Sequence, residues 1–164
     1  MNDQQNIADV LIRYASGIDS RDWDGFRSCF TEQCSLDYGT IGRWNNVAAF
    51  TCYMKLAHAG PSLHRLSNFT ICVQGDQAFT RSYVDALVYG PGGWTGAQAI
   101  GYYDDRLIRT ADGWKITERC HTSIRLKFLG ILSVIPAGLA SCLATFAAQR
   151  LYAKAQAGSH HKDN

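Results

Sequence analysis

Apolar residues near the N-terminus recur every three or four positions, which is the spacing of one face of an amphipathic helix. Asn2 or Asp3 is the expected N-cap of this helix, because a short polar side chain can accept hydrogen bonds from the free backbone N–H groups of a first turn. Asp22 is expected to cap a second, shorter helix that carries aromatic residues on one side. The residues that set the two patterns are Ile7, Val10, Leu11, Tyr14 and Ile18, and then Trp23, Phe26 and Phe30.

The period of the pattern changes at Pro61. Before it, residues 34–38 are expected to form a short strand, and residues 47–58 a third helix that Gly60 and Pro61 end. After it, partial alternation of apolar and polar residues predicts strands that glycine-containing turns separate. The predicted strands cover residues 63–73, 78–89, 94–109 and 114–126.

This order of elements predicts an α+β domain: three helices interleaved with one strand, a four-stranded meander, and a C-terminal helix. Hairpin-connected strands are antiparallel, so a doubly wound parallel sheet is not expected. The sheet must bury one face against the helices, and a strongly bent sheet wrapped around them makes a cone with an internal cavity. Aromatic residues from many elements could line it, namely Trp23, Tyr38, Trp44, Tyr53, Phe69, Tyr83, Trp94 and Tyr102.

An uncharged stretch covers residues 128–148 and is flanked by Lys127 and Arg150. About 20 apolar residues are long enough to cross a bilayer. Pro136 and Gly138 are expected to break this stretch into a short strand or turn and a helix of about four turns.

A pocket lid, a subunit interface and a membrane anchor are the three alternatives for this C-terminal region. We predict that residues 128–152 fold against the cone and cap its mouth or join subunits, because so large an apolar surface is rarely left bare. The chain therefore divides into a cone domain, residues 1–127, and an apolar helix with a polar tail, residues 128–164, packed on the same domain or on a partner subunit.

Composition excludes several classes of protein. The chain has 164 residues and a net charge of only +2, which argues against nucleic-acid binding, and its 46% hydrophobic content excludes disorder. No C-x-x-C pair, no histidine–carboxylate cluster and no glycine-rich phosphate loop is present, so neither a metal nor another cofactor is expected. The first residues lack the features of a signal peptide, and the six cysteines fit free thiols in a reducing cytoplasm.

A series of motifs is similar to those of the SnoaL-like family, within the nuclear transport factor 2 cone-fold superfamily. The motifs are RYASGIDSRDWD at Arg13–Asp24, Leu36-Asp37-Tyr38, Leu63-His64-Arg65, and Gly101–Asp104 followed by Asp112–Lys115. The likeness covers about residues 5–126 and is greatest to scytalone dehydratase and hexachlorocyclohexane dehydrochlorinase. It implies a cystatin-like α+β roll, whereas the reaction is less specified, because one fold hosts many chemistries.

The resemblance also implies a catalytic pair, an Asp at the end of the first helix and a His at the start of a strand, which match Asp19 and His64. A neutral imidazole suits proton abstraction, and an Asp on its other nitrogen fixes the tautomer and stabilises the imidazolium. Tyr38, which matches a pocket tyrosine, could polarise a carbonyl or protonate a departing hydroxide. Arg125 could stabilise an oxyanion if it points inward. Without the resemblance, Asp19 could simply cap a turn.

We therefore expect a cofactor-free lyase of the dehydratase type, acting on a small, largely apolar cyclic or aromatic compound. An isomerase or polyketide cyclase with the same pair, and a non-catalytic ligand-binding or assembly module, are the alternatives. His58 and His121 are expected to be structural or exposed. A homo-oligomer, a dimer or a trimer, is the expected assembly. The expected substrate-binding residues are Trp23, Trp44, Tyr83, Tyr102 and Asp104.

Overall fold

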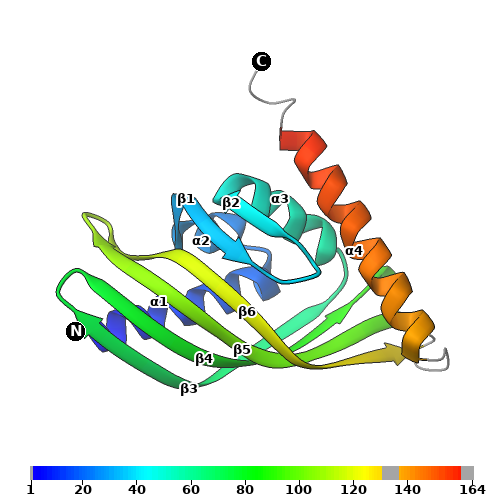
Figure 1. Ribbon diagram of the computed structural model, residues 1–164, viewed down its shortest axis with the longest axis horizontal. Coiled ribbons are helices and arrows are strands. Elements are labelled where there is room, and N and C mark those ends of the chain that lie inside the picture. The colour runs from blue at the N-terminus through cyan, green and yellow to red at the C-terminus, as the bar shows by residue number, and fades with distance from the viewer. Residues whose placement is uncertain (1, 131–136, 160–164) are drawn as a thin grey trace.

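The computed structural model describes residues 2–130 and 137–159 (Figure 1). Within these ranges the elements are α1 (Asp3–Ser20), α2 (Trp23–Ser28), β1 (Phe30–Asp37), β2 (Arg43–Asn46), α3 (Val47–Ala57), β3 (Ser62–Gln74), β4 (Gln77–Tyr89), the 3-10 turn η1 (Pro91–Gly93), β5 (Thr95–Thr110), β6 (Gly113–Gly130) and α4 (Ala137–Ser159).

The strands of the described residues form one six-stranded sheet in the order β2-β1-β6-β5-β4-β3. Strands β3 to β6 are the predicted antiparallel meander, and β1 lies parallel to β6, which makes the sheet mixed. The sheet is curved and not closed, and α1, α2 and α3 lie over its concave face (Figure 1). The predicted α+β class and the bent sheet around N-terminal helices are confirmed.

The first three helices begin where short polar side chains cap them. Asn2 accepts a hydrogen bond from the backbone N–H of Gln5, as predicted, and Asp22 caps α2 through the N–H of Gly25. Asn46 caps α3 in the same way. Each of these side chains satisfies a backbone donor that has no partner within the helix. Helix α1 ends at Ser20, and the φ of 65° at the C-cap residue Arg21 is left-handed and turns the chain sharply into α2.

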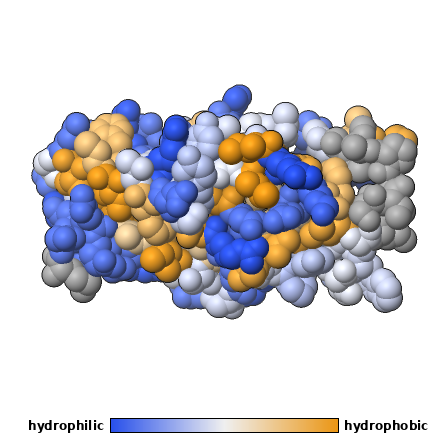
Figure 2. Space-filling view, turned by 90° about the horizontal axis from the view of Figure 1, so that it is seen from below, coloured by the Kyte–Doolittle hydropathy of each residue, from blue (hydrophilic) through white to orange (hydrophobic). Residues whose placement is uncertain are grey.

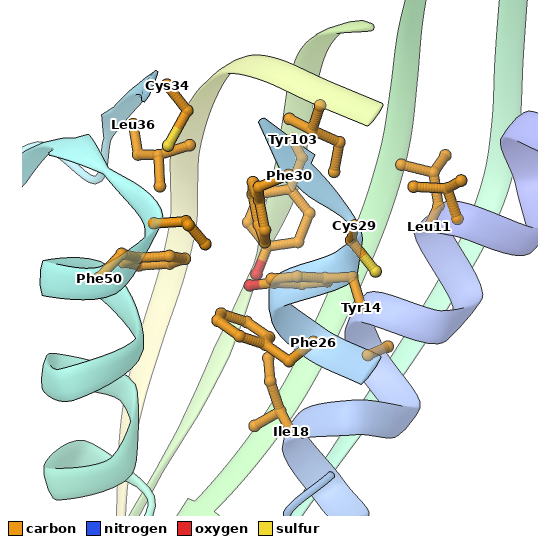
Figure 3. Close-up of a cluster of buried hydrophobic side chains, with 14 of the residues drawn as sticks. Leu11, Tyr14, Ile18, Phe26, Cys29, Phe30, Cys34, Leu36, Phe50 and Tyr103 are labelled. Carbon is orange, nitrogen blue, oxygen red and sulfur yellow. The ribbon is translucent and has the colours of Figure 1, made fainter. Parts of the chain in front are cut away.

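The core lies between the helices and the concave face of the sheet. Figure 3 shows Tyr14, Phe26 and Phe50, from α1, α2 and α3, gathered around Phe30 of β1. The ring centres of Tyr14 and Phe26 are 5.5 Å apart, and those of Phe26 and Phe50 are 5.6 Å apart. Such contacts between rings add to the burial of apolar area and hold the three helices at defined positions over the sheet.

Two strand predictions differ from the structure. Strand β1 begins at Phe30, before the predicted start at residue 34, and β2 was not predicted at all. Strand β2 has only four residues, and three of them, Arg43, Asn45 and Asn46, are polar. A strand this short forms because β1 lies beside it, and the pattern along the chain carries too few residues to indicate it.

The C-terminal region turns back over α3. Strand β6 continues to Gly130, and α4 runs from Ala137 over 23 residues, which is longer than the four turns expected. Pro136, where we expected a break, lies outside the described residues. The Tyr152 hydroxyl donates to the backbone oxygen of Arg43 (2.8 Å), and its ring centre lies 5.2 Å from that of Trp44. Among the described residues, no helix is both long and apolar enough to cross a membrane.

Candidate functional site

A cavity of about 400 Å³ lies between α3, α4 and the concave face of strands β4 to β6. Its walls are mostly apolar, with side chains such as Met54, Val84, Ala99 and Leu151. Nine polar side chains also line it. They are Tyr14, Tyr38, Tyr53, His58, His64, Tyr89, Thr95, Tyr103 and His121.

Asp19 and His64 meet at this cavity. Asp19 lies in the last turn of α1 and His64 at the start of β3. The Oδ1 atom of Asp19 is 2.7 Å from Nδ1 of His64, and Oδ2 accepts a hydrogen bond of 2.6 Å from the backbone N–H of His64. One carboxylate therefore holds both the ring and the backbone of the histidine, as the predicted pairing required.

Neighbouring groups hold Asp19 in place. The Ser62 hydroxyl donates to Oδ1 of Asp19 (3.0 Å) and accepts a hydrogen bond of 2.9 Å from Arg21. Arg21 also donates to the backbone oxygens of Ile18 and Gly60. This arginine thus joins the end of α1 to the start of β3, which is the junction at which the pair lies.

The tautomer of His64 follows from these contacts. A carboxylate can only accept, so Nδ1 carries the shared hydrogen and Nε2 of the neutral ring is an unprotonated base. Partial burial acts to raise the pKa of Asp19, but the hydrogen bonds and charge of His64, with the bond from Ser62, outweigh it and lower that pKa. Asp19 therefore stays ionised and can stabilise an imidazolium formed at His64.

Tyr38 lies on the cavity wall and is paired with Tyr14. Their hydroxyl oxygens are 3.0 Å apart, and both side chains are buried. Burial, followed by the effect of Tyr14, raises the pKa of Tyr38 well above its ordinary value, so the hydroxyl remains a neutral donor. One hydroxyl of the pair donates to the other, and the second hydrogen is left for another acceptor.

A buried cation lies behind the tyrosines. The guanidinium carbon of Arg119 is 4.0 Å from the ring centre of Tyr14 and 4.1 Å from that of Tyr103. Its Nε and one terminal nitrogen are 2.6 and 2.7 Å from the two carboxylate oxygens of Asp105. Burial acts to lower the pKa of Arg119. The charge and hydrogen bonds of Asp105 outweigh this and keep the Arg119 pKa well above its ordinary value. This cation favours negative charge that develops on a group bound beside the tyrosines.

Two histidines that we expected to be structural or exposed lie on the cavity wall instead. The ring centre of His58 is 5.3 Å from that of His64, and the ring centre of His121 is 5.4 Å from that of Tyr38. Burial, with the charge of His64, lowers the pKa of His58 to about 3, and burial with the charge of Arg119 lowers that of His121 to about 4. Both rings are neutral at pH 7.

A signal for His58 was present in the sequence. It follows Met54 by four positions, so a helical extension of the apolar pattern places it on the buried side of α3. For His121 the signal was weaker. Whether His121 points into the cavity depends on which face of β6 is turned inward, and the pattern of residues along the strand does not determine this face.

Three predicted substrate-binding residues lie on the opposite side of the sheet. Tyr83, Tyr102 and Asp104 alternate with residues of the cavity wall and point to the convex face, so this prediction was wrong. There Arg81 forms hydrogen bonds of 2.7 Å to Asp104 and lies 4.4 Å from the ring centre of Tyr102. The physical reason is the pleat, which sends neighbouring side chains to opposite faces. Polar and apolar residues are interspersed on the face of the molecule that Figure 2 shows from below.

Three more predicted residues, Arg125, Trp23 and Trp44, also lie outside the cavity wall. Arg125 is exposed on β6 and does not point inward as an oxyanion partner must. Trp23 packs against Phe26, with ring centres 5.9 Å apart. Trp44 is buried and supports the wall from behind, since its ring centre lies 5.8 Å from that of Tyr38. The correct inward-facing aromatic residue of β5 is Tyr103, one position after Tyr102.

Metal ligands do not gather in the part of the chain that the structure describes, since no group of three or more His, Cys, Asp or Glu side chains suited to an ion occurs there. The polar groups at the cavity are instead a base, a carboxylate that supports it and neutral hydroxyl donors. This set can move a proton to and from a bound compound.

The comparisons with known proteins agree with this fold. A family model described as a SnoaL-like domain matches residues 1–120. An uncharacterised protein of Mycobacterium tuberculosis, Rv2910c, is 30% identical over 138 residues, which cover 79% of this chain and 90% of that protein. The match to the family therefore includes both members of the Asp19–His64 pair.

Three solved structures are similar. A provisionally named aromatic ring hydroxylase from Novosphingobium aromaticivorans is 28% identical with a TM-score of 0.71, over 77% of this chain and 93% of that one. A provisionally named scytalone dehydratase from the same species is 19% identical (TM-score 0.70, 82% and 93%). A hexachlorocyclohexane dehydrochlorinase, LinA Type2, is 16% identical (TM-score 0.69, 82% and 94%). The last two show a shared fold, as the sequence motifs indicated.

Proposed function

Because the chain belongs to the SnoaL-like domain family, we propose that it is a cofactor-free lyase that eliminates a leaving group from a small, neutral, largely apolar ring compound. The observation that carries the proposal is the contact of 2.7 Å between Asp19 and His64 at the edge of an apolar cavity. The names of the similar scytalone dehydratase and dehydrochlorinase support elimination as the reaction class.

In the proposed reaction, Nε2 of His64 removes a proton from a carbon next to a carbonyl. The electrons of the broken C–H bond form a C=C bond, and the leaving group departs with its own electron pair. Asp19 stabilises the imidazolium that results. When the leaving group is hydroxide, His64 returns the proton to it and water is released, so the enzyme is regenerated without a further reactant.

The tyrosines and the buried arginine act on the carbonyl. Removal of a neighbouring proton places negative charge on the carbonyl oxygen, and a neutral hydroxyl of the Tyr14–Tyr38 pair can donate to that oxygen. Arg119, 4.0 Å behind the Tyr14 ring, favours this charge without touching the substrate. Fixed hydrogen-bond donors in a site with little water stabilise a developing negative charge more strongly than the same donors do in solution.

The apolar walls support the proposed kind of substrate. The charged groups nearest the cavity are already paired, Asp19 with His64 and Arg119 with Asp105, so an ionic substrate would lack a counterion there. Helix α4 adds Ala147, Ala148 and Leu151 to the wall. We propose that the helix closes the cavity and that its exposed side contributes to a homo-oligomer; a cytoplasmic location remains a prediction.

The test is a screen of the purified protein with cyclic ketones that carry a hydroxyl or a halide at the β carbon. Formation of the conjugated product is followed by its ultraviolet absorbance and by mass spectrometry. The proposal expects elimination by the wild type and a loss of about 10²–10⁴-fold in His64→Gln and Asp19→Asn. Equal rates in these variants contradict it. A product of unchanged mass shows instead that the pair serves an isomerase or cyclase.

A further inference from the structure

A hydrogen bond to the backbone of α3 sets the tautomer of His58, a histidine of the cavity wall. His58 follows α3 as the C-cap residue, and only 6% of it is exposed. Its Nδ1 is 3.1 Å from the backbone oxygen of Met54. A carbonyl oxygen can only accept, so Nδ1 carries the hydrogen and Nε2 has none. Nε2 is therefore a fixed hydrogen-bond acceptor.

No described residue donates a hydrogen bond to this acceptor. The hydrogen bonds of His58 within the described chain run back to Met54, from Nδ1 and from the backbone N–H. The ring lines the cavity, and Nε2 lies at the far side of the ring from the bond that Nδ1 makes to the helix. A ligand that fills the cavity displaces water from this nitrogen, so a ligand that supplies a donor in place of that water is favoured.

The neighbouring ring has the same character. Nδ1 of His64 is bound to Asp19, which leaves Nε2 of His64 unprotonated as well. The two ring centres are 5.3 Å apart. Two neighbouring rings thus each carry an unprotonated nitrogen, and neither can donate to the other while both rings are neutral. Burial holds the pKa of His58 at about 3, so the His58 ring is neutral at pH 7 and its Nε2 stays an acceptor.

We propose that His58 is a specificity-determining residue, which accepts a hydrogen bond at Nε2 from a hydroxyl group of the compound bound beside His64. The substrate class is therefore a neutral ring compound that bears a free hydroxyl close to the carbon that loses its proton. The hydroxyl that binds here is retained through the reaction, because His58 has no hydrogen to give to a departing hydroxide. The inference names the substrate of the site proposed above and rests on that proposal.

The test measures binding, so it does not depend on turnover. Three matched pairs of probes differ only in whether the oxygen carries a hydrogen: cyclohexanol and methoxycyclohexane, phenol and anisole, 2-naphthol and 2-methoxynaphthalene. We expect the wild type to bind the hydroxyl member of at least one pair about 10- to 100-fold more tightly by calorimetry. In His58→Phe the preference should fall to within about twofold, since the ring shape remains and the acceptor is gone.

Two controls make the result specific. His121→Phe removes another histidine of the same wall and should keep the preference, and His58→Gln, which retains an acceptor oxygen, should restore part of it. In wild-type protein with ¹⁵N-labelled histidine, the hydroxyl probe should shift the Nε2 resonance of His58, a readout that needs no variant.

The inference is wrong if no pair shows a preference in the wild type, if His58→Phe keeps it, or if the Nε2 resonance does not move. Each of these outcomes leaves the elimination assay untouched. Conversely, a preference that depends on His58 in a protein without lyase activity would remove the proposed reaction and leave a hydroxyl-selective binding site.

Discussion

Asp19 binds His64 twice, through the ring nitrogen Nδ1 and through the backbone N–H, and so fixes the start of β3 against the end of α1. The same carboxylate that sets the tautomer of the base also sets the position of its backbone. In the proposed reaction, activity and local stability are therefore coupled at this residue, and the two effects can be separated by choosing which contact a variant loses.

Substitution of Asp19 separates the two roles. Asp19→Asn keeps the size of the side chain but removes the charge that stabilises the imidazolium, so activity should fall about 10²–10⁴-fold with little loss of stability. Asp19→Ala also leaves the backbone N–H of His64 unpaired and should cost about 1–3 kcal/mol of unfolding free energy. Urea denaturation and the elimination assay measure both. Identical stability in the two variants would contradict the structural role.

Removal of the Ser62 hydroxyl should have a smaller effect. Ser62→Ala takes away one of the three hydrogen bonds to the Asp19 carboxylate and leaves both bonds from His64. We expect a stability loss of about 1 kcal/mol and an activity loss below about tenfold, because the geometry of the pair is kept. Steady-state kinetics check this, with Ser67→Ala, further along β3, as the matched control. A loss as large as that of Asp19→Asn would show that Ser62 takes part more directly.

The stability of the protein should fall as the pH decreases below about 6.5. The folded-state pKa values of His58 and His121, about 3 and about 4, lie below the ordinary value of 6.5. Between these values the unfolded chain binds more protons than the folded one, so acid favours unfolding. We expect a loss of about 2–4 kcal/mol between pH 7 and pH 5, measured by urea denaturation.

The control for the acid effect is the double variant His58→Leu, His121→Phe. It lacks both titrating groups and should show a much flatter dependence on pH over the same range, whatever its absolute stability. A wild-type stability that stays constant from pH 7 to pH 5 would mean that the two rings are protonated in the folded protein.

The buried pair of Arg119 and Asp105 should show strong coupling. Arg119→Met leaves a buried carboxylate without its partner, and Asp105→Leu leaves a buried guanidinium, so each should cost about 3–5 kcal/mol. The double variant removes both charges and should recover a large part of that loss. Denaturation of the four proteins gives the coupling energy directly. Additive losses would contradict the interaction that the geometry indicates.

Removal of residues 131–164 should open the cavity and uncover the side of α3 that α4 covers. Ala147, Ala148 and Leu151 leave the wall, and Trp44 loses its contact with Tyr152. We expect aggregation, measured by light scattering, or a loss of ligand binding, measured by calorimetry. Tyr152→Phe, which keeps the ring and loses the hydrogen bond to Arg43, is the mild control. A truncated protein that stays monodisperse and binds normally would show that α4 is dispensable.

Sequence patterns that span only a few residues were sufficient to predict much of the fold. The helical spacing of apolar residues and the caps Asn2 and Asp22 determined where α1 and α2 begin. Glycine-containing turns marked the meander. The positions of Asp19 and His64 within motifs that resemble those of the SnoaL-like family indicated the pair from the sequence.

Only the tertiary structure decided which side of each strand faces the cavity. Tyr102 and Tyr103 are adjacent and alike, and a shift of one position exchanges the inward and outward sets. His58 became visible as an acceptor only when β3 brought His64 beside it and a backbone oxygen of its own helix took its hydrogen. Arg119 likewise acquires its role from Tyr14, Tyr103 and Asp105, which come from α1 and β5. Contacts between distant elements depend on how the sheet bends and how the helices cross it, and the pattern along the chain carries no measure of either.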